Sequence, residues 1–245
     1  MKSILQDIVN HTQNLGFLTM VKISGTDKVT TINSMADDRS VIMEAVTASP
    51  YPDMMSVFGM PQLQKLKYLL DGAEYKEDAK ISITFADRNG ESIPVGIHFE
   101  NKDGDFKNDY RFMNTEIINE KMKTFKFRGA KWDVVISPSV AAVTRFNFQA
   151  GANSEHLTFL AKTDNGNLKF SFGDISSHGG EFIFAQNVVG KLDHAWAWPI
   201  QSILSILKIA DVNNTKMSIS NEGAIQITLD SGLATYNYII PAQTT

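Results

Sequence analysis

The sequence predicts an α+β protein made of two tandem halves, each with two short helices packed on antiparallel sheet. Three observations lead to this prediction. Most of the 245 residues fall into short runs that alternate apolar and polar side chains, as strands with one covered face do. Clusters such as DRNGES and TDNGN, which are typical of tight turns, separate neighbouring runs. Only four stretches have helical spacing, and the order of helices and strands repeats along the chain.

The predicted strands form two groups, mostly of antiparallel hairpins. The first half of the chain contributes residues 17–23, 40–48, 79–86, 92–100 and 109–114. The second half contributes residues 156–163, 167–174, 181–188, 216–220, 224–230 and 234–240. The segments between them are rich in Gly, Asn, Asp and Ser, which adopt turn conformations easily.

The four predicted helices cover residues 3–14, 61–70, 138–149 and 199–208. Three of them begin with proline, the residue best tolerated at the first helical position. Ser137 is the expected N-cap of the third helix, because a serine hydroxyl can accept a hydrogen bond from a free N–H of the first turn. The second and fourth helices each have one apolar face. These faces consist of Leu63, Leu66, Leu69 and Leu70, and of Ile200, Ile203, Leu204 and Leu207.

The second and fourth helices also align with each other. When Pro61 is placed on Pro199, two leucines of one helix fall on two leucines of the other, and after a slip of two residues the segment 80–83 falls on 216–219. The pattern indicates an internal duplication of about 120 residues with weak identity. We therefore expect one domain over residues 1–120 and a second over 121–245, joined by a connector at about 113–131.

The composition limits where the protein acts. The chain has no cysteine, which excludes a disulfide framework and a thiolate metal site. No apolar run approaches the roughly 18 residues that a membrane-spanning helix requires. The N-terminal segment MKSILQDIVNHTQN interrupts its apolar pattern with polar residues, so it predicts an amphipathic helix rather than a signal peptide. These features predict a soluble cytoplasmic protein without a membrane partner.

The charge is uneven along the chain. The net charge is −4, yet residues 121–245 hold 11 Lys/Arg against 9 Asp/Glu. The four predicted helices contain one acidic residue, Asp7, whereas ordinary surface helices mix Glu with Lys. Their basic residues are Lys65, Lys67, Arg145 and Lys208, with Lys2 just before the first helix. Acid-poor helices suit a surface that faces a polyanion, although so small a set could also lack acids by chance.

No constellation of catalytic residues is found in the sequence. The five histidines are scattered without the spacing of a metal site, and the sequence contains no phosphate-binding glycine loop and no nucleophile elbow. Asp193 and His194 are adjacent, but neighbours in an extended segment point to opposite faces, so a turn role is the more natural interpretation. The sequence thus predicts a protein that is not an enzyme, with no catalytic residue, metal or cofactor.

In the C-terminal 50 residues, a proline-led helix (WPIQSILSILKIAD) is followed by KMSIS, a turn at SNEGA, IQITLD and a last aromatic strand, ATYNYIIP. This order resembles the C-terminal part of DNA sliding clamps of the trimeric, two-domain type, which includes PCNA and the clamps of large tailed phages. The segment FGMPQLQKLKYLLDG is similar to the second helix of a phage clamp domain. The likeness extends over the layout of the whole chain but includes no invariant motif. No clamp segment matches SHGGEFIFAQNV or NKDGDFKNDY.

The resemblance implies two tandem clamp-type domains per chain and a homotrimeric ring, closed head to tail through edge strands and lined by the helices. Such a ring encircles duplex DNA without reading its sequence, tethers a DNA polymerase and is placed on DNA by a clamp loader. If the protein is phage-encoded, it acts in the cytoplasm of a host cell. The candidate DNA-contacting residues are Lys2, Gln64, Lys65, Lys67, Arg145, Ser202 and Lys208. Lys65 lies farther from the leucine stripe of its helix than Lys67 does. Each lysine could equally be an ordinary solvated side chain.

The resemblance also implies a groove that takes a short hydrophobic peptide of a partner, near the connector and the C-terminal tail. Its candidate residues are Phe125, Phe127, Tyr238, Ile239, Ile240 and Pro241. Core packing is the alternative role for these side chains.

Two other classes of function remain open. A β-rich phage structural ring or tube subunit without a DNA role would have the same duplicated layout. A single-strand binder would need aromatic and basic residues interleaved on one strand face, and FKFRGAKW is the one candidate segment.

Overall fold

The computed structural model describes residues 1–88, 90–123, 127–174 and 178–243. The chain forms two compact units. Unit 1 comprises Met1–Lys126 and Ser231–Thr235, and unit 2 comprises Phe127–Asp230 and Tyr236–Thr245. The first division between the units falls within the expected connector, but five residues of the second half of the sequence belong to unit 1. The chain therefore passes between the units three times.

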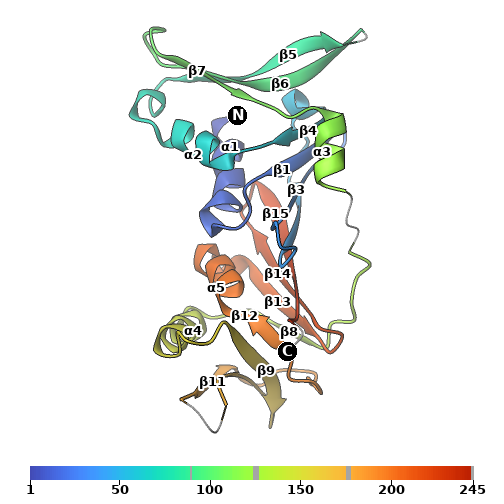
Figure 1. Cartoon of the computed structure of the whole chain (residues 1–245), viewed down its shortest axis with the longest axis vertical. Helices are drawn as coiled ribbons and strands as arrows, with labels where there is room; N and C mark the ends of the chain where they lie inside the picture. Colours follow the sequence, from blue (N-terminus) through green and yellow to red (C-terminus); the bar gives the residue numbers. More distant parts are fainter. Residues whose placement is uncertain (89, 124–126, 175–177, 244–245) are drawn as a thin grey trace. The chain divides into compact units, whose positions relative to one another are not determined.

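Unit 1 begins with helix α1 and contains two antiparallel sheets (Figure 1). In one sheet the strand order is β4-β1-β2-β3, and in the other it is β5-β6-β7. Helices α1 and α2 pack against each other. The elements are α1 (Lys2–Asn10), η1 (Gln13–Leu15), β1 (Val21–Gly25), β2 (Thr30–Met35), β3 (Ile42–Thr47), η2 (Pro52–Met54), β4 (Ser56–Met60), α2 (Leu63–Asp71), η3 (Ala73–Tyr75), β5 (Lys80–Arg88), β6 (Glu91–Glu100), β7 (Lys107–Arg111) and α3 (Thr115–Lys121).

Unit 2 repeats this arrangement with its own pair of packed helices, α4 and α5. One group of hydrogen-bonded strands has the order β11-β10-β9-β12, and the other has the order β15-β14-β13-β8. The elements are β8 (Val134–Ile136), α4 (Val140–Ala152), β9 (Thr158–Asp164), β10 (Asn167–Phe172), β11 (Gly180–Ala185), β12 (Ala197–Pro199), α5 (Ile200–Ile209), η4 (Val212–Asn214), β13 (Thr215–Ser220), β14 (Ala224–Asp230) and β15 (Ala234–Pro241).

The apolar faces predicted for α2 and α5 are buried, which confirms that both helices cover a core. The core of unit 2 is dominated by phenylalanine. Phe146 of α4 is fully buried, and its ring lies 5.0 Å from that of Phe159 and 5.5 Å from that of Phe170. The rings of Phe172, Phe182 and Phe184 also surround it. Edge-to-face and offset pairs of this kind stabilise a core beyond their buried area alone.

Each unit contains an isolated β-bridge, and the two bridges occupy equivalent positions. In unit 1, two residues beyond β7, Met113 exchanges backbone hydrogen bonds of 2.9 and 2.8 Å with Gly59 of β4. In unit 2, two residues beyond β15, Gln243 donates a backbone hydrogen bond of 2.9 Å to Ala197 of β12. Gly59 and Ala197 each precede by two residues the prolines that aligned in the sequence. The bridges are therefore equivalent contacts of the predicted repeat.

The helix starts differ from the predicted ones. α2 begins at Leu63 after Gln62, and α4 begins at Val140 after Ser139, so Pro61 and Pro138 lie outside their helices. The third proline of this kind, Pro199, is the N-cap of α5. The prediction that these prolines occupy the first helical position is wrong.

The N-cap of α4 is also not the predicted one. The hydroxyl of Ser139 accepts a hydrogen bond of 3.1 Å from the N–H of Ala142. The predicted cap, Ser137, lies two residues before the actual one, because Pro138 stays outside the helix and α4 begins only at Val140.

Replacing Ser139 by alanine is expected to lower the free energy of unfolding by about 1 kcal/mol, because the first turn of α4 loses its side-chain cap. Urea unfolding followed by fluorescence measures the change. Ser137→Ala is the matched control, since Ser137 is exposed and should change stability by less than about 0.5 kcal/mol. Equal losses in both variants would contradict the cap assignment.

A fifth helix, α3, lies within the expected connector, so the prediction of only four helices is wrong. Asn114 caps α3 by accepting a hydrogen bond of 3.0 Å from the N–H of Ile117. Ile118 packs onto β4 so closely that a Cβ atom on Gly59 would lie 2.8 Å from its Cδ1. A larger residue at position 59 would force Ile118 to shift, so the glycine lets α3 pack directly onto β4 within unit 1.

Candidate nucleic-acid interface

The one acidic residue that the sequence placed in the first helix does not reach the surface. Asp7 of α1 is only 9% exposed. Its carboxylate accepts a hydrogen bond of 2.9 Å from the hydroxyl of Ser231 and lies 3.3 Å from Nδ1 of His11. The exposed positions of α1 are Ser3, Gln6 and Asn10. The outward face of α1 therefore carries no carboxylate.

Helix α2 ends one residue later than predicted and includes an acid, Asp71. Asp71 pairs with Lys67, whose Nζ lies 2.7 Å from its carboxylate. Lys65 is exposed and has no ion pair or side-chain hydrogen bond within the described residues. The structure thus separates the two lysines: Lys65 is an unpaired cation, and Lys67 is half-buried and neutralised.

The helices of unit 2 carry no acidic residue at all. Arg145 of α4 and Lys208 of α5 are both exposed, and neither has an acidic partner in the part of the chain that the structure describes. Ser202 of α5 is half-buried beside the exposed Gln201. Because α4 and α5 pack together, Arg145, Ser202 and Lys208 belong to one helical pair.

Lys2 has a contact within the fold. Its Nζ donates hydrogen bonds of 2.6 Å to the carbonyl oxygen of Tyr75 and 3.0 Å to that of Lys76. These bonds tie the start of α1 to the short helical turn after α2. A DNA contact by Lys2 remains a prediction, and such a contact would compete with these two carbonyls.

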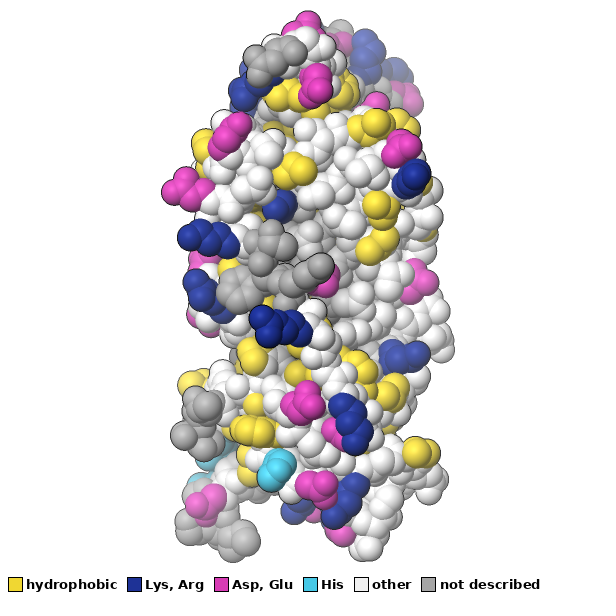
Figure 2. All heavy atoms as spheres, turned by 90° about the vertical axis from the view of Figure 1, so that its right-hand side faces the viewer, with side chains coloured by type: hydrophobic (Ala, Val, Ile, Leu, Met, Phe, Trp, Pro, Cys, Tyr) yellow, Lys and Arg dark blue, Asp and Glu magenta, His cyan; other side chains and the backbone are white. Residues whose placement is uncertain are grey.

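Several cations outside the helices are paired with carboxylates. In the three-stranded sheet, Lys80 and Lys107 each lie 3.0 Å from the carboxylate of Glu100. In unit 2, Lys169 lies 2.8 Å from the carboxylate of Asp164. Figure 2, which faces the right-hand side of the Figure 1 view, shows acidic and basic side chains interspersed over that face. The distinguishing property of α1, α2, α4 and α5 is that none of them carries an unpaired carboxylate, since Asp7 is held by Ser231 and Asp71 is paired with Lys67.

The ion pairs of Glu100 are expected to make the stability of the protein depend on pH. Hydrogen bonds from Lys107 and Lys80 lower the pKa of this carboxyl from 4.5 to about 2. A lowered folded-state pKa stabilises the protein above the unfolded-state pKa, and this contribution is lost as the pH falls toward the folded-state value. The stability difference between wild type and Glu100→Gln should therefore shrink between about pH 5 and about pH 3 in urea titrations. Glu77→Gln is the control, because Glu77 is exposed and has no ion pair among the described residues. A difference that is independent of pH would contradict the assignment.

Three of the six groove candidates are core residues. Tyr238, Ile239 and Ile240 of β15 are buried, whereas Pro241 is exposed. Phe127 is half-buried, and its ring lies 6.1 Å from that of Trp132. Phe125 lies outside the described residues. The groove remains a prediction, and of the four C-terminal candidates only Pro241 is exposed to a partner in this structure.

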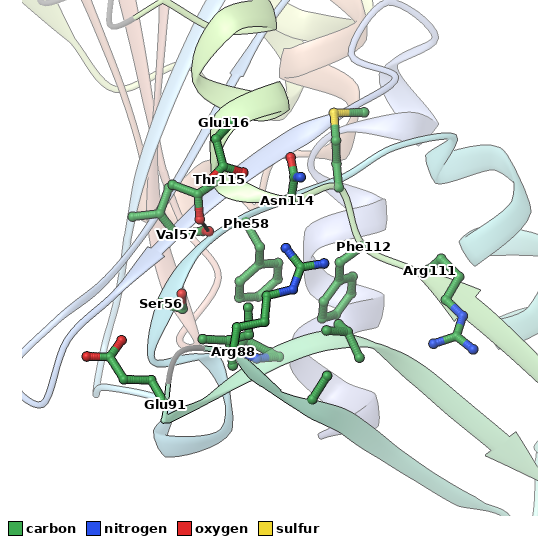
Figure 3. Close-up of a pocket in the computed structure, with 15 residues that line it drawn as sticks. Ser56, Val57, Phe58, Arg88, Glu91, Arg111, Phe112, Asn114, Thr115 and Glu116 are labelled. Atoms are coloured by element: carbon green, nitrogen blue, oxygen red, sulfur yellow. Dashed lines mark hydrogen bonds between the residues drawn. The ribbon is translucent and has the colours of Figure 1, made fainter.

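A hollow of about 700 Å³ in unit 1 was not predicted from the sequence (Figure 3). The rings of Phe58 and Phe112 stack in its floor at 4.4 Å, and the side chain of Arg88 reaches toward them while Glu91 points away. Its residues come from β4, the β5–β6 hairpin, the end of β7 and the start of α3. No local sequence pattern could have found it, because these segments are distant in the chain.

Among the residues that the structure describes, no group of three or more His, Asp or Glu side chains could hold a metal. The carboxylate of Asp193, the neighbour of His194, lies 2.8 Å from Nζ of Lys191, which lowers the pKa of that carboxyl. Within the same residues, none of the helices combines the length and apolar character needed to cross a membrane.

No protein-family model and no curated protein matches the sequence. The architecture, however, matches solved structures. PCNA from Thermococcus kodakaraensis superimposes with a TM-score of 0.69 over 98% of this chain and 97% of that chain, at 10% sequence identity. The chain has the PCNA-like clamp fold.

A second clamp structure supports the same fold. A. fulgidus PCNA, solved with the C-terminal region of FEN-1 bound, matches with a TM-score of 0.67 over 100% of this chain and 95% of that chain, also at 10% identity. The predicted α+β class with two tandem clamp-type domains is thereby confirmed. At this identity the comparison establishes the clamp fold alone.

Proposed function

We propose that this protein is a DNA sliding clamp, a processivity factor that encircles duplex DNA as a homotrimer and tethers a replicative DNA polymerase. The observation that carries the proposal is the unpaired positive charge on the helices of a PCNA-like fold. Lys65, Arg145 and Lys208 have no acidic partner among the described residues, although the chain as a whole has a net charge of −4. A ring lined by such helices attracts DNA through the field in its hole, whatever the total charge.

The free strand edges support a ring assembly. Within the described strands, β7 ends the three-stranded sheet of unit 1 and β11 ends a sheet of unit 2. Edge strands leave backbone N–H and C=O groups unpaired, which favours pairing with another chain. Pairing of β7 of one copy with β11 of the next joins unlike surfaces, and such head-to-tail contacts close into a ring when the rotation fits. Three copies give the proposed ring.

The contacts to DNA would be independent of its sequence. Lysine, arginine, glutamine and serine side chains on the helices can meet phosphate oxygens without reading base edges. A closed ring then stays on DNA by topology, because breaking individual contacts does not release it. The polymerase is held near the primer end by its raised effective concentration. A clamp loader would open the ring, and the function needs no metal or cofactor.

We extend the proposal to a phage origin, which would place the clamp in the cytoplasm of a host cell. The basis is the likeness of FGMPQLQKLKYLLDG to a phage clamp helix. The same helix, α2, presents Lys65.

Two measurements test the function. The mass in solution should be about three times 27.2 kDa. Protein loaded on nicked circular DNA should be retained, and linearising the DNA should release it, because a ring runs off free ends. A structural ring or tube subunit of the same mass would show no dependence on DNA topology and would not stimulate a polymerase. Equal retention on circular and linear DNA would refute the clamp.

A further inference from the structure

One helix of each unit exposes a large aromatic ring three residues after an unpaired cation. On α2, Tyr68 is 77% exposed and follows Lys65. On α4, Phe148 is 71% exposed and follows Arg145. Residues three apart lie next to each other on the same face of a helix. Each unit therefore presents a cation and an aromatic ring side by side.

The surroundings of the two rings have the same chemistry. An open hollow of about 530 Å³ beside Tyr68 is lined by Gln13, Thr19, Gln62, Gln64, Lys65 and Tyr68. An open hollow of about 490 Å³ beside Phe148 is lined by Thr144, Arg145, Phe148, Gln149 and Phe182. Both contain threonine, glutamine, one cation and the exposed ring, and neither contains a carboxylate. We call these two sets the Tyr68 site and the Phe148 site.

Packing within the chain does not account for the two rings. Neither ring stacks on another aromatic ring among the described residues, and neither is covered by its own unit. A single exposed apolar side chain is common on proteins. Two rings with the same neighbours, on helices whose free cations attract a polyanion, point instead to a shared ligand.

We propose that the Tyr68 and Phe148 sites bind unpaired nucleotides of DNA. The inference rests on the proposed clamp function and extends it from duplex to single-stranded DNA. An aromatic ring can stack on the face of an unpaired base, and a neighbouring cation can meet the phosphate of the same strand. The threonine and glutamine side chains supply hydrogen-bond donors and acceptors for the sugar and the base edge.

Unpaired DNA fits these sites better than duplex DNA does. In a duplex the base faces are covered by their neighbours in the stack, so an exposed ring finds only backbone. The cations serve both forms of DNA, whereas the rings add affinity only where bases are free. The ligand is therefore the single strand beside a primer end, held through ring and phosphate together.

Binding of a labelled oligo-dT strand and of a duplex of equal length, each followed by fluorescence anisotropy, tests the proposal. We expect Tyr68→Ala with Phe148→Ala to weaken oligo-dT binding at least fivefold, roughly the loss of one stacked base. Duplex binding and retention on circular DNA should change by less than about twofold. Tyr68→Phe with Phe148→Tyr keeps both rings and should bind oligo-dT like wild type.

The outcomes separate this proposal from the clamp itself. Unchanged oligo-dT binding in the double alanine variant, with retention on circular DNA intact, would overturn the nucleotide sites and leave the clamp standing. Equal losses for oligo-dT and duplex, or a loss of trimer mass, would also overturn them. Impaired polymerase stimulation with normal oligo-dT binding would assign the rings to a protein partner instead. A wild type that is not retained on circular DNA would refute the clamp, whatever the rings bind.

Discussion

Lys65→Glu combined with Arg145→Glu is expected to abolish most of the affinity for duplex DNA while leaving the assembly intact. The variant removes one unpaired cation from each unit and puts a carboxylate in its place, so attraction to phosphate becomes repulsion. Each phosphate contact contributes about 0.9 to the slope of log affinity against log salt. We therefore expect the slope to fall by about 2 for each chain that contacts DNA. Anisotropy titrations at several salt concentrations measure it.

A matched control keeps the total charge change and moves it off the helices. Lys28 lies in an exposed turn and Lys216 is exposed on β13, and neither has an acidic partner among the described residues. Lys28→Glu with Lys216→Glu should leave the salt slope near that of wild type. Both double variants should keep the mass of the wild-type assembly. If the Lys65/Arg145 variant slides and supports processive synthesis as well as wild type, these helices do not line the path of DNA.

Phe146→Ala is expected to have the largest effect on stability. Phe146 is fully buried among five other phenylalanine rings of unit 2, and removing a buried phenylalanine costs about 3–5 kcal/mol through lost burial and the cavity left behind. Trp132, Trp196 and Trp198 all belong to unit 2. Tryptophan fluorescence during urea unfolding therefore reports on the unit that carries the cavity.

Phe148→Ala provides the control on the same helix, two residues away. Because the ring of Phe148 is largely exposed, its removal should change the free energy of unfolding by less than about 0.5 kcal/mol. The pair thus separates a ring that holds the core from a ring available to a ligand. A comparable loss of stability in both variants would show that Phe148 also packs in the folded protein.

Periodicity was sufficient to predict the helices that form the candidate interface. The apolar stripes of α2 and α5 are buried, and Lys65 and Lys208 on the same helices are exposed. The same reasoning placed Lys65 farther from the stripe than Lys67, and Lys65 is indeed the more exposed of the two. These features depend on neighbours within one or two helical turns, which a sequence displays directly.

Several strands were missed because their local pattern is weak. β8 and β12 have three residues each, too few to show alternation. β2 buries polar side chains at its inward positions: the hydroxyl of Ser34 donates a hydrogen bond of 2.6 Å to the carbonyl oxygen of Met20, and Thr30 Oγ1 accepts one of 3.0 Å from the N–H of Tyr51. A hydroxyl that is hydrogen-bonded can occupy a buried position in place of an apolar side chain. The sequence of β2 therefore does not alternate between apolar and polar residues.

The features of the candidate interface that could not be predicted depend on contacts between residues far apart in the sequence. Asp7 is buried because Ser231, which is 224 residues away in the chain, donates to its carboxylate. Lys2 is held by the carbonyl of Tyr75, 73 residues away. Neither partner is visible in the spacing around Asp7 or Lys2. The number of unpaired carboxylates and cations on the helices therefore depends on the folded chain rather than on composition.

The five residues that unit 1 takes from the far end of the sequence have a practical consequence for proteolysis. Leu233 accepts a backbone hydrogen bond of 2.8 Å from Ala48, and Ser231 holds Asp7, both inside unit 1. A protease nick between the halves would consequently yield two fragments that co-purify until denatured, since the C-terminal fragment completes the fold of the N-terminal one. A fragment ending at Lys126 would lack residues Ser231–Thr235, so the buried carboxylate of Asp7 would lose the hydrogen bond that Ser231 donates. This loss would cost about 1–3 kcal/mol of stability.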